Sequence, residues 1–227
     1  MSLPMTAWAP DSRLRLDPEA MRLEEFARAF YLQKTAVVAR RLIGAWIARR
    51  HNGRWFGARI VETEAYLGSA DAAAHSWRGR HTPRVAPMYM AGGHLYVFFV
   101  YGMHHCANIV TRREGVPEAV LLRAAEGPPG APTKLLSGPG RLCAALGITT
   151  ARSGEDLLQG SDLRVFREPR QHHAEIGISS RIGVDYAGEA RELPLRFFDI
   201  RSPAVSGPAR LRNSPTAQPQ KQEIQRG

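Results

Sequence analysis

The sequence predicts a single mixed α/β domain that contains antiparallel β-hairpins. Its 227 residues suit one domain with a sizeable core, and its 44% hydrophobic and 23% charged residues are ordinary for a globular protein. Asn52-Gly53 separates two strand-like runs, and Asn-Gly is a strong signal for a hairpin turn. Another strand-like run, residues 95–100, is followed after a short turn by a return run. Because neither an internal repeat nor a linker interrupts the chain, we expect one domain over residues 16–205.

Two helices are expected near the N-terminus, after a disordered lead over residues 1–15. Asp17-Pro18 predicts the start of the first helix, because proline suits the first helical position. The apolar residues that follow at helical spacing are Leu23, Phe26 and Phe30. A second helix is predicted over residues 35–42.

Strands follow, interrupted by one long loop. Residues 67–93 are rich in Ala, Arg, Gly and Pro, and a loop of that length inside a compact domain usually has a function. A third helix is predicted over residues 141–146. The chain turns polar near its end, so residues 206–227 are expected to be disordered. The predicted strands cover residues 45–50, 54–64, 95–100, 106–111, 119–124, 163–167, 175–179 and 195–200.

The charge balance points to a polyanionic partner. Lys+Arg is 31 and Asp+Glu is 21, which gives a net charge of +10. Nucleic acid is the first candidate and an anionic membrane surface the second, although solubility alone explains such a balance equally well. Cys106 and Cys143 lack metal-type spacing, and we find neither a transmembrane run of ~20 apolar residues nor a secretory signal. We therefore expect a cytoplasmic protein without a membrane partner.

Two carboxylates stand out on the second predicted strand. Glu62 and Glu64 are two residues apart, so both project to one face, and Tyr66 shares their parity. A solvent-facing strand edge is the simplest interpretation, whereas a pocket would make one of them a general base. Glu62, Glu64 and His75 could also be combined into a metal site, but their spacing matches no common ligand pattern, and no metal is expected.

The turn after residue 100 carries unusually large side chains. Tyr101 and Met103 stand where polar residues are expected, so they either pack against a neighbouring loop or insert between DNA bases. Before this turn, Tyr96 and Phe98 share one strand face, as core residues or as a stacking surface. Arg84, with two nearby arginines, forms a basic cluster that suits either phosphate contact or an ordinary solvated loop.

The order of these and other motifs is informative. Residues 59–66 read Arg-Ile-Val-Glu-Thr-Glu-Ala-Tyr, and the further motifs are Thr82-Pro83-Arg84, Leu95-Tyr96-Val97, Tyr101-Gly102-Met103, Leu121-Leu122-Arg123-Ala124, Ser137-Gly138-Pro139 and Arg181-Ile182-Gly183-Val184. In order and spacing they resemble the alkyladenine (3-methyladenine) DNA glycosylase family, over roughly residues 30–205. The resemblance implies a single α/β domain with a curved antiparallel sheet, surrounding helices and a protruding β-hairpin, and it implies no cofactor.

The resemblance also implies catalytic and DNA-binding roles. Glu64 matches the general base that activates water, and Arg123 and the backbone carbonyl of Ile182 match groups that help to hold that water. Tyr101 matches the residue that intercalates where the damaged base was. Met103 matches a neighbour of that wedge.

A base-binding pocket is implied in the same way. Tyr66, His75 and Phe98 match three rings that sandwich the flipped base. The third ring is usually tyrosine, so the lost hydroxyl at Phe98 is expected to affect the substrate range. Asn108 matches the residue that crowds the exocyclic amine of guanine, and we expect Arg84 to bind the DNA backbone.

The function predicted on these grounds is a monofunctional DNA glycosylase. It would flip out and hydrolytically excise alkylated, and also deaminated, purines in base excision repair, and it would leave an abasic site. The expected partner is double-stranded DNA with damaged bases, bound by a monomer in the cytoplasm, or at the nucleoid in a bacterium. A non-catalytic binder of damaged DNA is the alternative.

Overall fold

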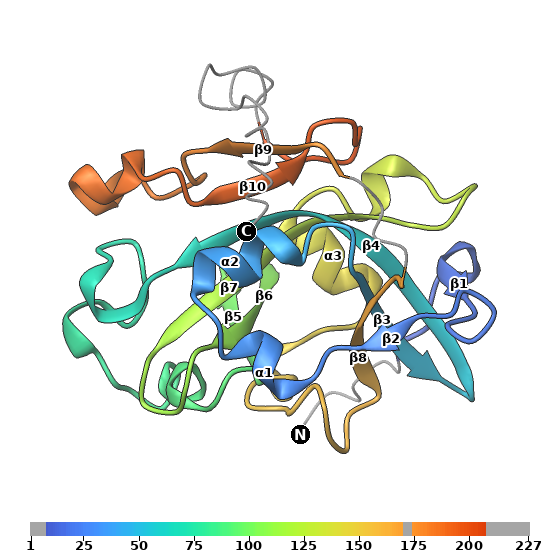
Figure 1. Ribbon diagram of the computed structural model, residues 1–227, viewed down its shortest axis with the longest axis horizontal. Coiled ribbons are helices and arrows are strands. Elements are labelled where there is room, and N and C mark those ends of the chain that lie inside the picture. The colour runs from blue at the N-terminus through green and yellow to red at the C-terminus, as the bar shows by residue number, and fades with distance from the viewer. Residues whose placement is uncertain (1–7, 170–173, 208–227) are drawn as a thin grey trace, which may run out of the picture.

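An antiparallel sheet with few helices forms the domain in this computed structural model, which describes residues 8–169 and 174–207 (Figure 1). The sheet joins ten strands within the described residues. These are β1 (Arg15–Leu16), β2 (Glu24–Glu25), β3 (Trp46–His51), β4 (Arg54–Tyr66), β5 (Leu95–Val100), β6 (His104–Thr111), β7 (Glu118–Glu126), β8 (Leu163–Arg167), β9 (Ile176–Ser179) and β10 (Arg196–Asp199). The α-helices are α1 (Arg28–Tyr31), α2 (Thr35–Arg41) and α3 (Pro139–Ala145).

The 13-residue strand β4 organises the sheet. The main strand order is β2-β8-β3-β4-β7-β6-β5, while β1 and β10 also pair with β4. Pairing with β7 shifts register between Ile60 and Thr63, and a bulge of this kind bends a strand and increases its twist. The sheet therefore curls into a half-barrel, and the predicted fold class is confirmed.

The core lies between this curled sheet and the helices that pack on it. Helix α2 lies across β4, where the Thr63 hydroxyl donates a hydrogen bond of 2.9 Å to the Ala39 carbonyl. Val38 and Leu42 are fully buried beneath the helix, as the predicted helical spacing requires. Helix α3 packs instead against β6 and β7. The second and third predicted helices and the predicted strands are confirmed within one or two residues of their bounds.

The helix predicted from Asp17 is wrong. The Asp17 carboxylate accepts the backbone N–H groups of Glu19 and Ala20 and so closes a turn, which ends at Arg22 with φ of 54°. The short strand β2 and helix α1 follow. Phe26 and Phe30 are buried as expected, but as stacked rings 3.9 Å apart rather than as one face of a long helix.

Part of the expected N-terminal lead packs against the domain. The Trp8 indole donates to the Ala145 carbonyl, the 3₁₀-helix η1 (Ser12–Leu14) buries Leu14, and β1 pairs with β4. The rest of the lead, residues 1–7, and residues 208–227 of the predicted tail lie outside the described residues. None of the helices described is long and apolar enough to cross a membrane.

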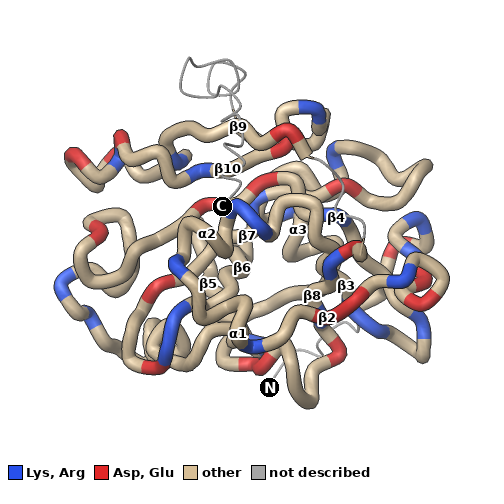
Figure 2. The backbone as a smooth tube through the Cα atoms, in the orientation of Figure 1, with Lys and Arg blue, Asp and Glu red and all other residues tan. Residues whose placement is uncertain are grey.

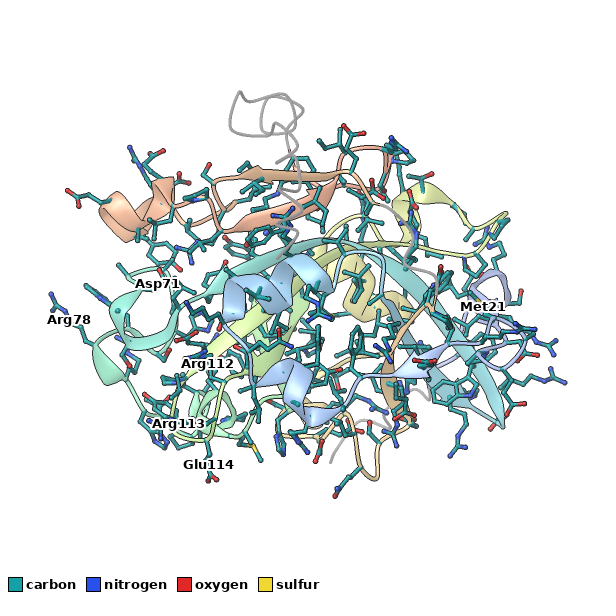
Figure 3. The ribbon with its side chains drawn as sticks, in the orientation of Figure 1. Met21, Asp71, Arg78, Arg112, Arg113 and Glu114 are labelled. Carbon is teal, nitrogen blue, oxygen red and sulfur yellow. The ribbon has the colours of Figure 1, made fainter. Side chains whose placement is uncertain are left out.

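The long loop 67–93 contains three 3₁₀-helices, η2 (Gly68–Ala70), η3 (Trp77–Gly79) and η4 (Ala86–Tyr89). Asp71 ties its first part together, because its carboxylate accepts the backbone N–H groups of Leu67 and Ala73. The same carboxylate forms an ion pair with Arg181, at 2.5 Å. Figure 3 labels Asp71 in this loop, below the segment that contains the 3₁₀-helix η7 (Asp185–Glu192).

Candidate active site

Strand β4 carries both glutamates into the interior. Glu62 and Glu64 are fully buried and both contact Arg123 on β7, so they share one side of the strand, as predicted. The solvent-facing strand edge is therefore excluded. Because an isolated buried carboxylate is costly, the surrounding donors decide what each glutamate can do.

Glu62 accepts hydrogen bonds from two buried arginines and one backbone N–H. Oε1 accepts from Nε of Arg123 at 3.0 Å and from Nε of Arg196 at 2.7 Å. Oε2 accepts the backbone N–H of Ser206 at 2.6 Å. Two buried arginines thus face one carboxylate, which suits a structural anchor better than a proton acceptor.

Glu64 has a different set of partners. Its Oε1 accepts the Ile182 backbone N–H at 2.7 Å and lies 3.2 Å from Nη1 of Arg123. The Tyr66 hydroxyl donates to Oε2 at 2.9 Å. Burial and the Glu64 charge raise the pKa of Tyr66 well above its ordinary value, so this hydroxyl stays protonated. Ile182 contacts Glu64 through its N–H, whereas the resemblance implied a role for its carbonyl.

Arg123 joins the two carboxylates. Burial lowers its pKa, but the charges of Glu64 and Glu62 more than offset that effect, so the pKa is raised and the guanidinium stays charged. A fixed cation between two buried carboxylates keeps both oriented.

A cavity of about 590 Å³ lies beside this cluster, and its size is in the range of small-molecule sites. Seven predicted site residues line it: Tyr66, His75, Phe98, Tyr101, Asn108, Arg123 and Ile182. The remaining lining includes Tyr96, Leu121, Val184, Tyr186, Ser137, Gly138 and residues 139–141 at the start of α3. The predicted pocket residues are thus brought together by the long loop 67–93, the hairpin β5–β6 and the strands β4 and β7.

His75 is fixed in one orientation on the cavity wall. Its Nδ1 lies 2.8 Å from the Tyr96 hydroxyl, and its ring centroid is 4.5 Å from that of Phe98, at an interplanar angle of 74°. Burial raises the pKa of Tyr96 to about 12. Burial, with the charges of Arg84 and Arg80, lowers the pKa of His75, which favours the neutral imidazole.

Asn108 is also buried, and its Nδ2 donates to the Tyr96 carbonyl at 3.1 Å. The hairpin β5–β6 holds Asn108 directly opposite Tyr96 in register, which explains the contact. Strand pairing thus fixes the amide at the cavity.

The tip of this hairpin is exposed. Tyr101 is 84% exposed and Met103 is 71% exposed, so neither packs against a neighbouring loop. The Met103 N–H donates to the Val100 carbonyl, and Tyr101 and Gly102 both have positive φ, which the tight turn requires. Tyr101 lines the cavity, whereas Met103 does not.

Arg84 lies near the cavity rather than far out on the loop. Its guanidinium is 5.8 Å from the Phe98 ring centroid, and Nη2 is 3.5 Å from the Phe99 carbonyl. Arg78 of the same basic cluster points outward (Figure 3) and stacks on Trp77.

Sequence reasoning missed the supports behind the pocket. Arg181 is buried, donates to Asp71 and the Ala65 carbonyl, and lies 4.8 Å from the Tyr66 ring centroid. Arg196 was not foreseen as a partner of Glu62 either. No spacing signal in the sequence links these residues, since their partners come from distant strands and loops.

The metal hypothesis fails on geometry. Across residues 8–169 and 174–207, no three His, Cys, Asp or Glu residues are grouped so that they could hold a metal ion. Glu62, Glu64 and His75 therefore do not form such a site, and His75 pairs with Tyr96 instead.

Comparison with known proteins agrees with the resemblance seen in the sequence. The family model described as methylpurine-DNA glycosylase matches residues 29–203. A relative from Desulfitobacterium hafniense named "Putative 3-methyladenine DNA glycosylase" is 44% identical over 203 residues, which cover 81% of this chain and 99% of the relative. A relative from Bdellovibrio bacteriovorus with the same name is 44% identical over 176 residues, which cover 74% of this chain and 92% of the relative. The expected family and enzyme class, a DNA N-glycosylase for alkylated purines, are confirmed. The chain belongs to the methylpurine-DNA glycosylase family.

Proposed function

We propose that this protein hydrolyses the N-glycosidic bond of alkylated purines in DNA, with Glu64 activating the attacking water. The observation that carries this proposal is the fully buried Glu64 carboxylate, which does not itself line the cavity but is oriented by three residues that do, Ile182, Arg123 and Tyr66. A carboxylate fixed in this way can accept a proton and can also stabilise positive charge.

The reaction resembles glycoside hydrolysis. Alkylation of a ring nitrogen leaves the purine cationic, so the base departs with the bonding electron pair and the sugar becomes oxocarbenium-like. Water adds its oxygen to the sugar carbon and gives its proton to Glu64. The proposal includes no Schiff base, which is supported by the lack of lysine among the described lining residues, and the expected product is an intact abasic site.

The base must leave the helix to reach this carboxylate, and such extrusion costs a few kcal/mol. In the proposal, Tyr66, His75 and Phe98 sandwich the extruded base, and Tyr101 occupies the gap that it leaves. A cationic base gains ~0.5–2 kcal/mol from each ring face, provided that His75 is neutral. Deaminated purines would stack without that gain, so we expect them to be weaker substrates.

The proposal also assigns the residues that select the base and contact the DNA, and the place where the protein acts. The Asn108 amide would crowd the exocyclic amine of guanine, while Arg84 and Met103 would contact DNA around the lesion. The protein would act as a monomer on chromosomal DNA, in the cytoplasm or at the nucleoid. Light scattering of the free protein tests the monomer.

The decisive experiment is single-turnover excision of a methylated purine by Glu64→Gln. We expect binding to abasic-site DNA to be retained, and base release to fall by at least about 100-fold, because the general base is lost. Glu114→Gln, an exposed glutamate, is the matched control (Figure 3). Normal excision by Glu64→Gln would remove the assigned role, and no base release by the wild type would favour the non-catalytic binder.

A further inference from the structure

Tyr186 lies in the first turn of η7 and has an unusual environment for an exposed aromatic residue. Its hydroxyl donates a hydrogen bond of 3.0 Å to the Ala73 carbonyl, while 69% of the residue is exposed. The side chain also lines the cavity. A large exposed ring that is held in place at a cavity can serve as a contact surface for a ligand in that cavity.

The backbone around Tyr186 is anchored to the loop that carries His75. Val184 and Ala187 are buried and pack with Ala73 in one apolar cluster. Gly183 and Gly188 have positive φ on either side of them, so the segment makes two sharp changes of direction. Figure 1 shows η7 above the loop 67–93. The ring is thus held beside the cavity while the residue stays mostly exposed.

Tyr186 is exposed and also lines the cavity, so it lies at the entrance to the site. Burial raises the pKa of its phenol, Arg181 lowers it, and Asp71, Glu64 and Tyr101 raise it further, so the phenol stays protonated. Tyr101 reaches the same cavity from the hairpin. Two exposed tyrosines from different walls therefore border one entrance.

We propose that the Tyr186 ring packs against the deoxyribose of the extruded nucleotide. This inference rests on the proposed function, because it concerns the same site. Tyr66, His75 and Phe98 lie deeper and take the base, so a ring at the entrance meets the sugar. The hydroxyl already bonds Ala73, which leaves the apolar ring as the contact surface. Because the ring is ordered beforehand, binding costs little side-chain entropy.

The test compares Tyr186→Ala with Tyr186→Phe by the affinity for two duplexes. One duplex contains a tetrahydrofuran abasic-site analogue, and the other is undamaged. The readout is the ratio of the two Kd values, which a loss of folded protein leaves unchanged. We expect Tyr186→Ala to lower the preference for the abasic duplex about tenfold, and Tyr186→Phe to stay within about twofold of the wild type.

The matched control is Trp77→Ala, which removes an exposed aromatic residue that does not line the cavity. It should leave the ratio unchanged. An unchanged ratio for Tyr186→Ala would overturn the contact. Equal losses for Ala and Phe would overturn it as well, since the bond to Ala73 would then be the important feature. The readout does not use base release, so failure of the proposed catalysis is seen separately.

Discussion

At the residue scale, two glutamates that are two positions apart on β4 have unequal surroundings. Glu62 faces Arg123, Arg196 and the Ser206 N–H, whereas Glu64 shares Arg123 and is otherwise bonded by neutral donors. Removing the negative charge from Glu62 would leave Arg196 buried with its closest carboxylate gone. The two carboxylates should therefore differ in what their loss does to the protein.

We expect Glu62→Gln to destabilise the protein far more than Glu64→Gln does. Breaking a buried ion pair on one side costs about 3–5 kcal/mol, and Arg123 keeps one carboxylate partner in either variant. Thermal melts of the two variants, at equal protein concentration, check this. A Tm for Glu62→Gln equal to that of Glu64→Gln would show that Arg196 needs no such anchor.

The lowered pKa of His75 predicts how base release and protein stability depend on pH. Burial, Arg84 and Arg80 lower its pKa below the ordinary 6.5, so the imidazole stays neutral as the pH falls to that value. Base release from a methylated, cationic purine should therefore hold as the pH falls to 6.5, and decline only below it. The folded protein binds fewer protons than the unfolded chain in this window, so stability falls as the pH drops from 6.5 through the folded pKa.

NMR titration of His75 measures this shift directly. Arg84→Gln removes one nearby positive charge and should raise the His75 pKa, and the acid limb of the rate profile should move up with it. Lys34→Gln, far along the chain from the pocket residues, is the comparison. A His75 pKa at or above 6.5 in the wild type contradicts the neutral ring.

At the scale of elements, the hairpin β5–β6 combines strain with exposure. Tyr101 adopts φ of 52°, which a side chain tolerates at a cost of about 1–2 kcal/mol, and its ring is mostly exposed. Strain of this kind often accompanies a functional position. The hairpin thus gives up some stability to present an aromatic ring at the cavity entrance.

Tyr101→Gly separates the two effects. Glycine accepts the positive φ, so the Tm should stay the same or rise, whereas the affinity for abasic-site DNA should fall about tenfold through the lost wedge. Differential scanning calorimetry and fluorescence anisotropy are the measurements. A lower Tm with unchanged affinity would make Tyr101 a packing residue.

Elements with a strong local signal could be predicted from the sequence. The Asn52-Gly53 turn and the apolar, strand-like run of β5 indicate their strands, because turn chemistry and strand composition are local properties. The helix predicted at Asp17 failed, because the Asp17 side chain closes its own turn and burial against distant strands decided the rest. An element whose position depends on packing against distant parts of the chain leaves no such local pattern in the sequence.

The same distinction applies to the site. Glu64 and Tyr66 could be proposed from strand parity, and the motif order added the remaining pocket residues. The sequence could not predict that Arg181 pairs with Asp71 or that Arg196 pairs with Glu62. Each pair comes together only when the sheet has curled. The pairing of β10 with β4 brings Arg196 level with Glu64, and no spacing along the chain encodes that register.

At the scale of the whole molecule, many basic residues are occupied within the protein. Arg59, Arg123, Arg181 and Arg196 are paired with carboxylates in or near the interior. Lys and Arg are spread over the whole chain rather than gathered in one block (Figure 2). The net charge of +10 therefore accounts for attraction to DNA, but it does not identify the surface that binds DNA. Substitution of exposed arginines near the cavity can identify that surface.

Salt dependence of DNA binding identifies those arginines. Each phosphate contact contributes a slope of about −0.9 to a plot of log K against log salt concentration. Arg84 and Arg141 are exposed beside the cavity, so replacing either with alanine should make the slope shallower by about 1 and weaken binding to damaged and undamaged duplexes alike. Arg54, exposed at the opposite end of β4, should leave the slope unchanged when replaced. Equal slopes for all three variants would place the DNA elsewhere on the surface, because only residues that neutralise phosphates release counterions.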